Sequence, residues 1–198
     1  GHSGKVLFMR VFLAVLVLIF SLQSWTKADD IRDFEIEGMS IGDSALNFYS
    51  KENIKNEKKI NYPSSDRFYG ISFYVNNSDY DAFGFMFKKN DNNFIIYQVK
   101  GMLKMDFKEC MEKKDNVKKE VKNILENFKE NNYTSVYGNK MGKSFSEVSD
   151  LDLENGRIRV WCENWDKNFE ASKYWDNHFN VSAASKEYLN WLDNEAYQ

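Results

Sequence analysis

A dense group of aromatic and acidic residues, WCENWD at positions 161–166 followed by YWD at positions 174–176, carries the side chains best suited to chemistry. Aromatic rings can stack on the apolar faces of sugars, and carboxylates accept hydrogen bonds from hydroxyl groups. Two carboxylates in such a cleft could also serve as the acid and base of a glycosidase. The candidate ligand surface therefore comprises Glu163, Trp165, Asp166, Tyr174 and Trp175. The alternative is that these aromatic residues complete the core and edge of a sheet.

The chain of 198 residues contains two cysteines, Cys110 and Cys162. In an oxidising compartment they would form a disulfide, and with two cysteines the connectivity is unambiguous. Closing a loop of about fifty residues stabilises a fold by roughly 4 kcal/mol in the chain-entropy account. The alternative is a pair of buried reduced thiols. A catalytic thiol is disfavoured because no histidine lies near either cysteine in the sequence.

The sequence offers little support for metal, cofactor or nucleophile chemistry. His2 and His178 are the two histidines, which excludes a histidine-rich zinc site of the HExxH type. A Ser-His-Asp arrangement would depend on His178, and no nucleophile-elbow motif supports it. The acidic run at 150–156 lacks the sixth-position glycine and twelfth-position glutamate of an EF-hand loop. We therefore expect no metal, no cofactor and no assigned catalytic residue.

An uninterrupted apolar run, Val11–Leu22, follows a basic residue and precedes a polar boundary. This order is typical of a secretory signal peptide, with Ala28 as the last residue before cleavage. Twelve helical residues span about 18 Å, whereas the hydrocarbon core of a bilayer is about 30 Å thick. The run is therefore short for a membrane span, which favours a leader that is removed. The sequence leaves open that the leader is retained as an anchor. Because Met9 stands just before the run, we interpret residues 1–28 as an upstream remnant plus signal peptide, and residues 29–198 as a single domain.

The charge balance bears on possible partners. The chain has 27 basic and 30 acidic residues, and residues 1–28 hold three basic and no acidic ones. The remaining domain therefore has 24 basic and 30 acidic residues, a net charge of −6. Nucleic-acid binding needs a net basic surface, so we expect no nucleic-acid partner. We also expect a periplasmic or secreted location, no stable membrane span once the leader is removed, and a small molecule or an envelope protein as the open partner classes.

Strands are predicted wherever the apolar pattern has a period of two. Three such segments are separated by polar turns, which indicates an antiparallel meander with one buried face. A second cluster follows later in the chain, and an Asn-Gly pair there predicts a hairpin. The predicted strands cover residues 69–75, 83–88, 94–103, 133–139, 145–153, 157–163 and 178–183.

Helical spacing of apolar residues predicts one long amphipathic helix over Phe107–Phe128, capped by Asp106. A short helix is expected near Asp43–Tyr49, another after Ser185, and a solvated connection at 51–59. The predicted fold class is α+β: antiparallel β-meanders packed on one long amphipathic helix, with short N- and C-terminal helices. The pattern leaves open whether the two strand clusters form one sheet or two.

Several stretches resemble one group of proteins: FEIEGMSIGDSALNFYS at 34–50, Cys110 at the start of the predicted long helix, RIRVWCENW at 157–165, and HFNVSAASKEYLNWLDNEAY at 178–197. As a set they are similar to uncharacterised exported proteins of marine alphaproteobacteria. The resemblance implies export and paired cysteines, and it implies no substrate. We expect an exported, non-enzymatic binding or envelope-associated domain. The alternative is a small carboxylate-dependent hydrolase acting on glycans.

Overall fold

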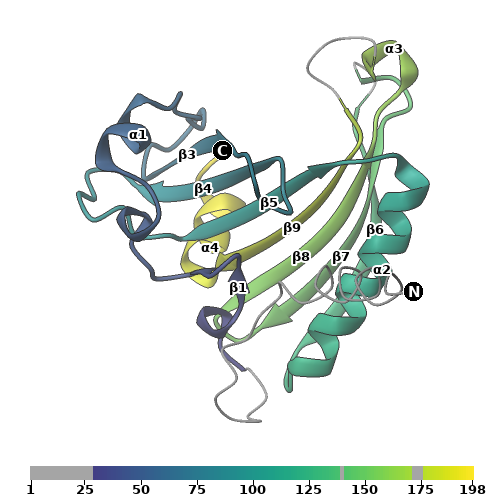
Figure 1. Ribbon diagram of the computed structural model, residues 1–198, viewed down its shortest axis with the longest axis horizontal. Coiled ribbons are helices and arrows are strands. Elements are labelled where there is room, and N and C mark those ends of the chain that lie inside the picture. Colours follow the sequence, from purple (N-terminus) through teal and green to yellow (C-terminus); the bar gives the residue numbers. More distant parts are fainter. Residues whose placement is uncertain (1–28, 139–140, 171–175) are drawn as a thin grey trace, which may run out of the picture.

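Seven antiparallel strands form a single sheet in the computed structural model, which describes residues 29–138, 141–170 and 176–198 (Figure 1). The predicted signal peptide lies outside the described residues. The spatial order of the strands is β3-β4-β5-β9-β8-β7-β6. Their bounds are β3 Phe68–Tyr74, β4 Ala82–Lys88, β5 Gln98–Lys104, β6 Lys129–Val136, β7 Phe145–Leu153, β8 Gly156–Asn164 and β9 His178–Ser185.

The last strand in the sequence, β9, lies at the middle of the sheet and joins the two strand clusters. Val181 in β9 pairs with Gly101 of β5 on one side and with Val160 of β8 on the other. The predicted architecture, β-meanders packed on one long helix, is wrong, because a seven-stranded sheet dominates the fold and α2 packs mainly on two of its strands. The α+β content is confirmed. The sequence left open whether the two clusters form one sheet or two, and they form one because β9 supplies hydrogen-bonding partners to each of them.

The helix α2, Phe107–Ile124, is shorter than predicted and covers only part of the sheet. Asp106 caps it as expected, accepting a hydrogen bond of 3.0 Å from the backbone N–H of Glu109. The helix packs mainly on β8 and β9. Toward β6 the contact is polar, since Lys118 and Lys122 reach Glu130 at 3.4 and 2.5 Å. Apolar packing on this helix therefore organises the middle of the sheet rather than the whole of it.

The predicted disulfide between Cys110 and Cys162 is confirmed, with the two Cα atoms 5.9 Å apart and the two residues separated by 52 positions in the sequence. Both cysteines are fully buried. The bond ties the first turn of α2 to the far end of β8. On the chain-entropy account this closure is worth about 4 kcal/mol of stability.

Strands β3, β4 and β5, the first half of the sheet, carry an aromatic core. Phe73, Phe83, Phe85 and Phe87 are all buried, and the rings of Phe85 and Phe87 stack with centroids 6.0 Å apart. The N-terminal elements cover this side of the sheet and contribute apolar side chains to the same cluster. They are the 3₁₀ turns η1 Ile31–Asp33 and η2 Ala45–Asn47, the short strands β1 Glu35–Ile36 and β2 Met39–Ser40, and the helix α1 Lys51–Asn56.

Two local predictions in this N-terminal region are wrong. The helix expected near Asp43–Tyr49 is a single 3₁₀ turn, because the backbone of this segment bonds to residues 94–96 instead of to itself. Gly42 makes this geometry accessible with a φ of +94°. The connection expected at 51–59 contains α1, which is stabilised by the buried side chain of Ile54 beneath a charged exterior.

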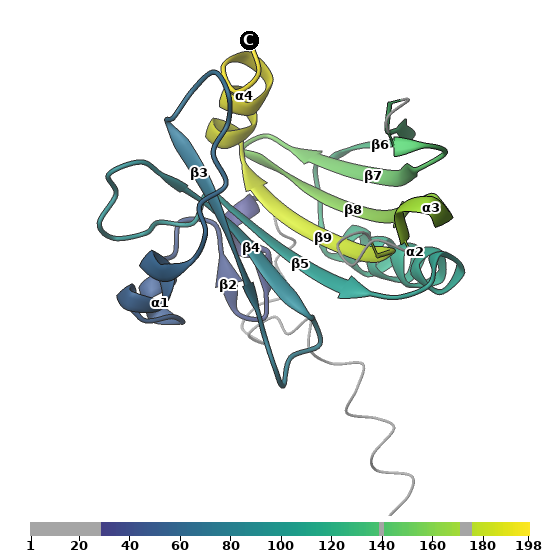
Figure 2. The ribbon, with the colours of Figure 1, turned by 90° about the horizontal axis from the view of Figure 1, so that it is seen from above.

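A C-terminal helix, α4 Lys186–Asn194, packs on the sheet face opposite to α2 (Figure 2). The hydroxyl of Ser185 caps it by accepting a hydrogen bond from the backbone N–H of Tyr188. Its Trp191 is fully buried in a small cluster with Phe68 and Met86 of the first half of the sheet. Across the part of the chain that the structure describes, no helix is long and apolar enough to cross a bilayer.

Candidate functional site

The two sides of strand β8 differ in chemistry. Ile158, Val160 and Cys162 are fully buried toward α2. Because side chains alternate along a strand, Arg159 and Trp161 project to the other side. The same alternation applies to the neighbours of β8, as fixed by the strand register. We call this side of β5, β9, β8 and β7, facing away from α2, the polar face.

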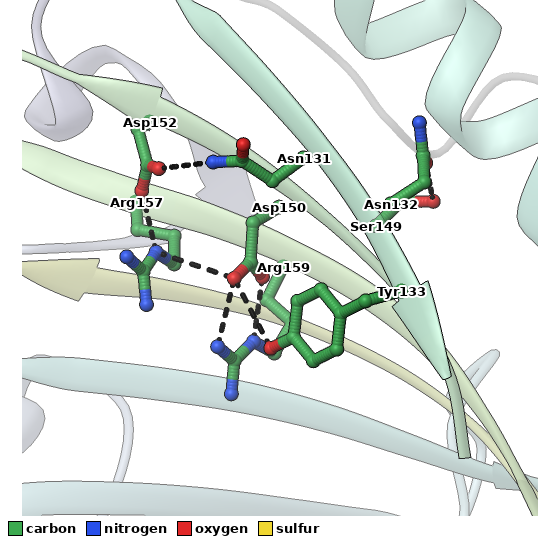
Figure 3. A network of polar contacts seen from close by, with 8 residues as sticks. All are labelled: Asn131, Asn132, Tyr133, Ser149, Asp150, Asp152, Arg157 and Arg159. Carbon is green, nitrogen blue, oxygen red and sulfur yellow. Dashed lines mark hydrogen bonds and ion pairs between the residues drawn. The ribbon is translucent and has the colours of Figure 1, made fainter. Parts of the chain in front are cut away.

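Acid–arginine pairs cross the polar face between β7 and β8 (Figure 3). Asp150 lies opposite Arg159, whose Nε and Nη2 donate to its two carboxylate oxygens at 2.6 and 2.8 Å. The hydroxyl of Tyr133, on β6, donates to the same carboxylate at 3.3 Å. Next along the strands, Arg157 donates to Asp152 at 2.5 Å. These bidentate and cross-strand pairs hold the charged groups in fixed positions.

The ion pair between Asp150 and Arg159 is partly buried, and this burial affects the pKa of Arg159. The side chain of Asp150 is only 5% exposed, whereas that of Arg159 is 34% exposed. Burial opposes the charge of Arg159, but the hydrogen bonds and the charge of Asp150 outweigh that effect, so the pKa of Arg159 is raised. Arg159 therefore stays charged under all physiological conditions.

Lys100 and Trp161 lie beside these pairs on the polar face. The Nζ atom of Lys100 is 5.9 Å from the centroid of the Trp161 ring. The indole N–H of Trp161 donates to Glu163 at 3.2 Å, which fixes the orientation of the ring. Burial lowers the pKa of Lys100, and the negative charge of Glu163 opposes this shift. The stem of Lys100 crosses Gly84, where a Cβ atom would come within 3.3 Å of its Cε.

Small polar residues form the floor between these larger side chains. Asn180 and Ser182 of β9 are 1% and 2% exposed, although both point toward the polar face. They stand opposite Trp161 and Arg159 in the register, so the larger side chains cover them. The polar face thus combines a rigid aromatic ring, paired charges and a lysine over a floor of small side chains.

The structure places the predicted ligand residues at different points. Glu163 lies on the polar face beside Trp161. Trp165 is 7% exposed and stacks on Tyr137, with ring centroids 4.8 Å apart. The Tyr137 hydroxyl lies 2.6 Å from that of Ser146, which stands opposite Glu163 in the register, so the stacked Tyr137 and Trp165 rings lie at the end of β7 and β8 where Glu163 stands.

Asp166, just after the end of β8, holds neighbouring backbone segments in place. Its carboxylate accepts hydrogen bonds from the backbone N–H groups of Lys143 and Asn168 at 2.9 and 3.0 Å. These bonds lower the pKa of Asp166. Asp166 thereby ties the segment before β7 to the start of the short helix α3, Lys167–Glu170. Tyr174 and Trp175 lie outside the described residues.

Sequence reasoning considered Asp150 only as the start of a rejected calcium-binding run. It did not single out the other members of the polar face, Lys100, Tyr133, Arg159 and Ser182. The signal in the sequence that could have found the polar face is the alternation of apolar and polar residues along β8. Once the apolar positions of β8 are assigned to the core, the intervening positions must form a second surface. The pattern could not show which strands are neighbours in the sheet. That order places Lys100 and Arg159 on either side of the same strand, β9.

The arrangement does not resemble a metal centre. Within residues 29–138, 141–170 and 176–198, no three His, Cys, Asp or Glu side chains gather closely enough to hold a metal ion.

Comparisons of the chain with known protein families, with curated proteins and with solved structures found no match.

Proposed function

We propose that this protein is an exported, periplasmic or secreted domain that binds its ligand on the polar face without chemical conversion. The resemblance to exported proteins of marine alphaproteobacteria and the apolar run Val11–Leu22 support the export part of this proposal. The buried disulfide between Cys110 and Cys162 also supports it, because such bonds persist in oxidising compartments.

The observation that carries the binding role is the fixed geometry of the polar face. Hydrogen bonds hold Trp161 and Arg159 in place before any ligand arrives. A preorganised surface loses little conformational entropy on binding, which favours recognition. Aromatic rings beside carboxylates, amides and a lysine suit a polar ligand with an apolar ring face, such as a saccharide.

A carboxylate-dependent hydrolase remains the competing function from the sequence. A glycosidase acid must keep its proton near neutral pH, so its pKa has to be raised. The hydrogen bonds to Asp166 lower its pKa, which suits a structural carboxylate better than a general acid. Binding without hydrolysis is therefore the function that we favour.

Export can be tested by expressing the full chain in a Gram-negative host and fractionating the cells. We expect the protein in the periplasmic or culture fraction, with the mass of residues 29–198 less two hydrogen atoms. Reduction should restore those two hydrogens, and a Cys110→Ser/Cys162→Ser variant should show no change on reduction. A protein of full mass in the cytosol, with free thiols, would refute the export proposal.

Binding can be tested by thermal-shift measurements on the purified protein against a panel of neutral and acidic oligosaccharides and divalent ions. At least one saccharide should raise the melting temperature without releasing new reducing ends. Trp161→Ala should remove this shift, whereas Tyr74→Ala, at an aromatic residue 92% exposed on β3, should not. No shift across the panel would overturn the binding role, and release of reducing ends would establish the hydrolase instead.

A further inference from the structure

The strand β6 forms one edge of the sheet, and its outer side is open. Residues 132–136 are all exposed, including Tyr133 at 40% and Val136 at 73%. The opposite edge, β3, is partly covered, since Ile60 and Gly70 exchange backbone hydrogen bonds of 2.8 and 2.9 Å. The helix α2 packs mainly on β8 and β9, so it lies against the interior of the sheet and not along the β6 edge (Figure 2).

Backbone hydrogen-bonding groups of β6 point out from this edge. Tyr137, just after the strand, donates its N–H to the carbonyl of Ser144 at 3.1 Å, in the register that β6 and β7 share. Bonded positions alternate along an antiparallel pair, so the odd-numbered residues of β6 bond to β7 and the even-numbered ones turn their N–H and C=O groups outward. The outward groups belong to Glu130, Asn132, Thr134 and Val136. Among the residues that the structure describes, none of these groups has a hydrogen-bond partner.

Most of this edge lacks the features that prevent strands from pairing. Proteins commonly protect an edge with proline, a bulge or charged side chains. Residues 131–136, NNYTSV, contain no charge and no proline, and their pairing with β7 continues without a bulge. The two charged residues of the strand, Lys129 and Glu130, stand at its start, and lysines of α2 already bind Glu130. The edge is therefore suited to an added strand, and its neutral stretch gives no preference to a charged one.

The sequence of β6 is complementary to itself in an antiparallel pair. Outward groups must face outward groups, so even-numbered residues must stand opposite even-numbered residues of a second copy. In one register Glu130 stands opposite the second copy's Val136. Asn132 then stands opposite Thr134, and every outward N–H and C=O group of β6 gains a partner. No like charges oppose each other in this register, and Tyr133 meets the second copy's Tyr133, where the two rings can pack.

We infer that two copies of this protein associate through β6 and form one continuous antiparallel sheet about a two-fold axis. This inference goes beyond the proposed binding function and does not depend on it. A second copy is the occupant because the strand itself supplies the complementary edge, with neutral side chains opposite one another. The axis is perpendicular to the sheet, so the polar faces of the two copies lie on the same side of the dimer.

Sedimentation equilibrium of the purified, disulfide-bonded protein tests the association. We expect a mass that rises with concentration to twice that of the monomer. Thr134→Pro removes an outward N–H and leaves the bonds to β7 in place, so it should weaken dimerisation at least about tenfold. Thr134→Val is the matched control, because it also loses the hydroxyl bond to Glu147 but keeps the N–H. It should dimerise like the wild type, with the fold of both variants checked by circular dichroism.

Cysteine crosslinking tests the register. Directly opposite residues that do not bond to each other have Cα atoms about 4.5 Å apart, which is within the range of a disulfide. Tyr133→Cys should therefore form a covalent dimer under mild oxidation, seen by non-reducing electrophoresis. Ser135→Cys is exposed on the same side of the same strand, but its two copies would be about 14 Å apart, so it should stay monomeric in this assay.

Each other outcome overturns a defined part of the inference. A protein that remains monomeric at submillimolar concentrations would refute the dimer. A folded Thr134→Pro variant that dimerises like the wild type would move the interface away from β6. Crosslinking through Ser135→Cys instead of Tyr133→Cys would refute the register. If Thr134→Pro does not fold, the crosslink at Tyr133→Cys decides the matter alone, and its absence refutes the pairing.

Discussion

In the first half of the sheet, β3 to β5, phenylalanine side chains face the N-terminal elements on one side and α4 covers the other side. In the second half, β6 to β8, apolar residues face α2, and the opposite side carries arginine–carboxylate pairs. Burial of the rings gains stability from excluded water, an effect without direction, whereas the arginine–carboxylate pairs depend on fixed hydrogen-bond geometry. The first half is thus built for stability, and the second half presents ordered polar groups to the surroundings.

The largest expected effect comes from the aromatic core of the first half. Phe87 is fully buried and contacts the rings of Phe85 and Phe94. Phe87→Ala should lower the free energy of unfolding by about 3–5 kcal/mol, because it removes packing and leaves a cavity. Urea denaturation measures this value. Tyr74→Ala, at an exposed residue of the same half, should change it by less than about 0.5 kcal/mol. A loss below about 1 kcal/mol for Phe87→Ala would show that ring packing does not hold this half together.

An intermediate effect is expected for the ion pair of the second half. Asp150→Val leaves Arg159 facing the polar face without its carboxylate, which should cost about 2 kcal/mol of unfolding free energy. Asp150→Val/Arg159→Val should cost less than the single change, because no unpaired charge remains and both residues favour a strand. A double-mutant cycle from urea denaturation checks this. Additive losses would mean that the two side chains act independently.

The smallest effect concerns the polar contact between β6 and α2. Hydrogen bonds from Lys122 and Asn132, together with the charge of Lys118, lower the pKa of Glu130 to about 2. The unfolded value is about 4.3, so the folded state binds this proton less readily. The stabilisation is therefore complete above about pH 5 and is lost as the pH falls toward 2.

For a group at the surface, screening reduces this contribution to about 1 kcal/mol. Unfolding free energies measured from pH 7 to pH 2.5 should fall less steeply for Glu130→Gln than for the wild type. Glu126→Gln, at an exposed glutamate next to the end of α2, should keep the wild-type slope. Identical slopes for Glu130→Gln and the wild type would show that this contact does not depend on the charge of Glu130.

The sequence predicted local structure well where apolar residues recur with a clear period, although β4 is buried on both faces and not on the single face expected of the meander. Alternation at Phe83, Phe85 and Phe87 matched β4, and Asp106 and Ser185 capped the helices as expected. The helix α1 was missed because its single buried side chain, Ile54, is surrounded by charged residues and produces no apolar stripe.

Long-range pairing was the part that sequence reasoning could not reach. The alternation in β9 is compatible with an edge or a central strand, because period two reports which faces are buried and not which strands are neighbours. The same gap hid the candidate site. Lys100 and Arg159 are 59 positions apart in the sequence, and they stand in one row of the sheet only because β9 lies between their strands.

The position of β9 has a consequence for how the chain must fold. Residues 178–185 supply the centre of the sheet, yet they are synthesised after all of the other strands. Until these residues join the sheet, β5 and β8 each lack one hydrogen-bonding neighbour, and Cys162 lacks Phe179 beside it. The sheet therefore cannot close before the last of its strands is available, and a polypeptide truncated before His178 should be degraded or aggregate through its unpaired strands.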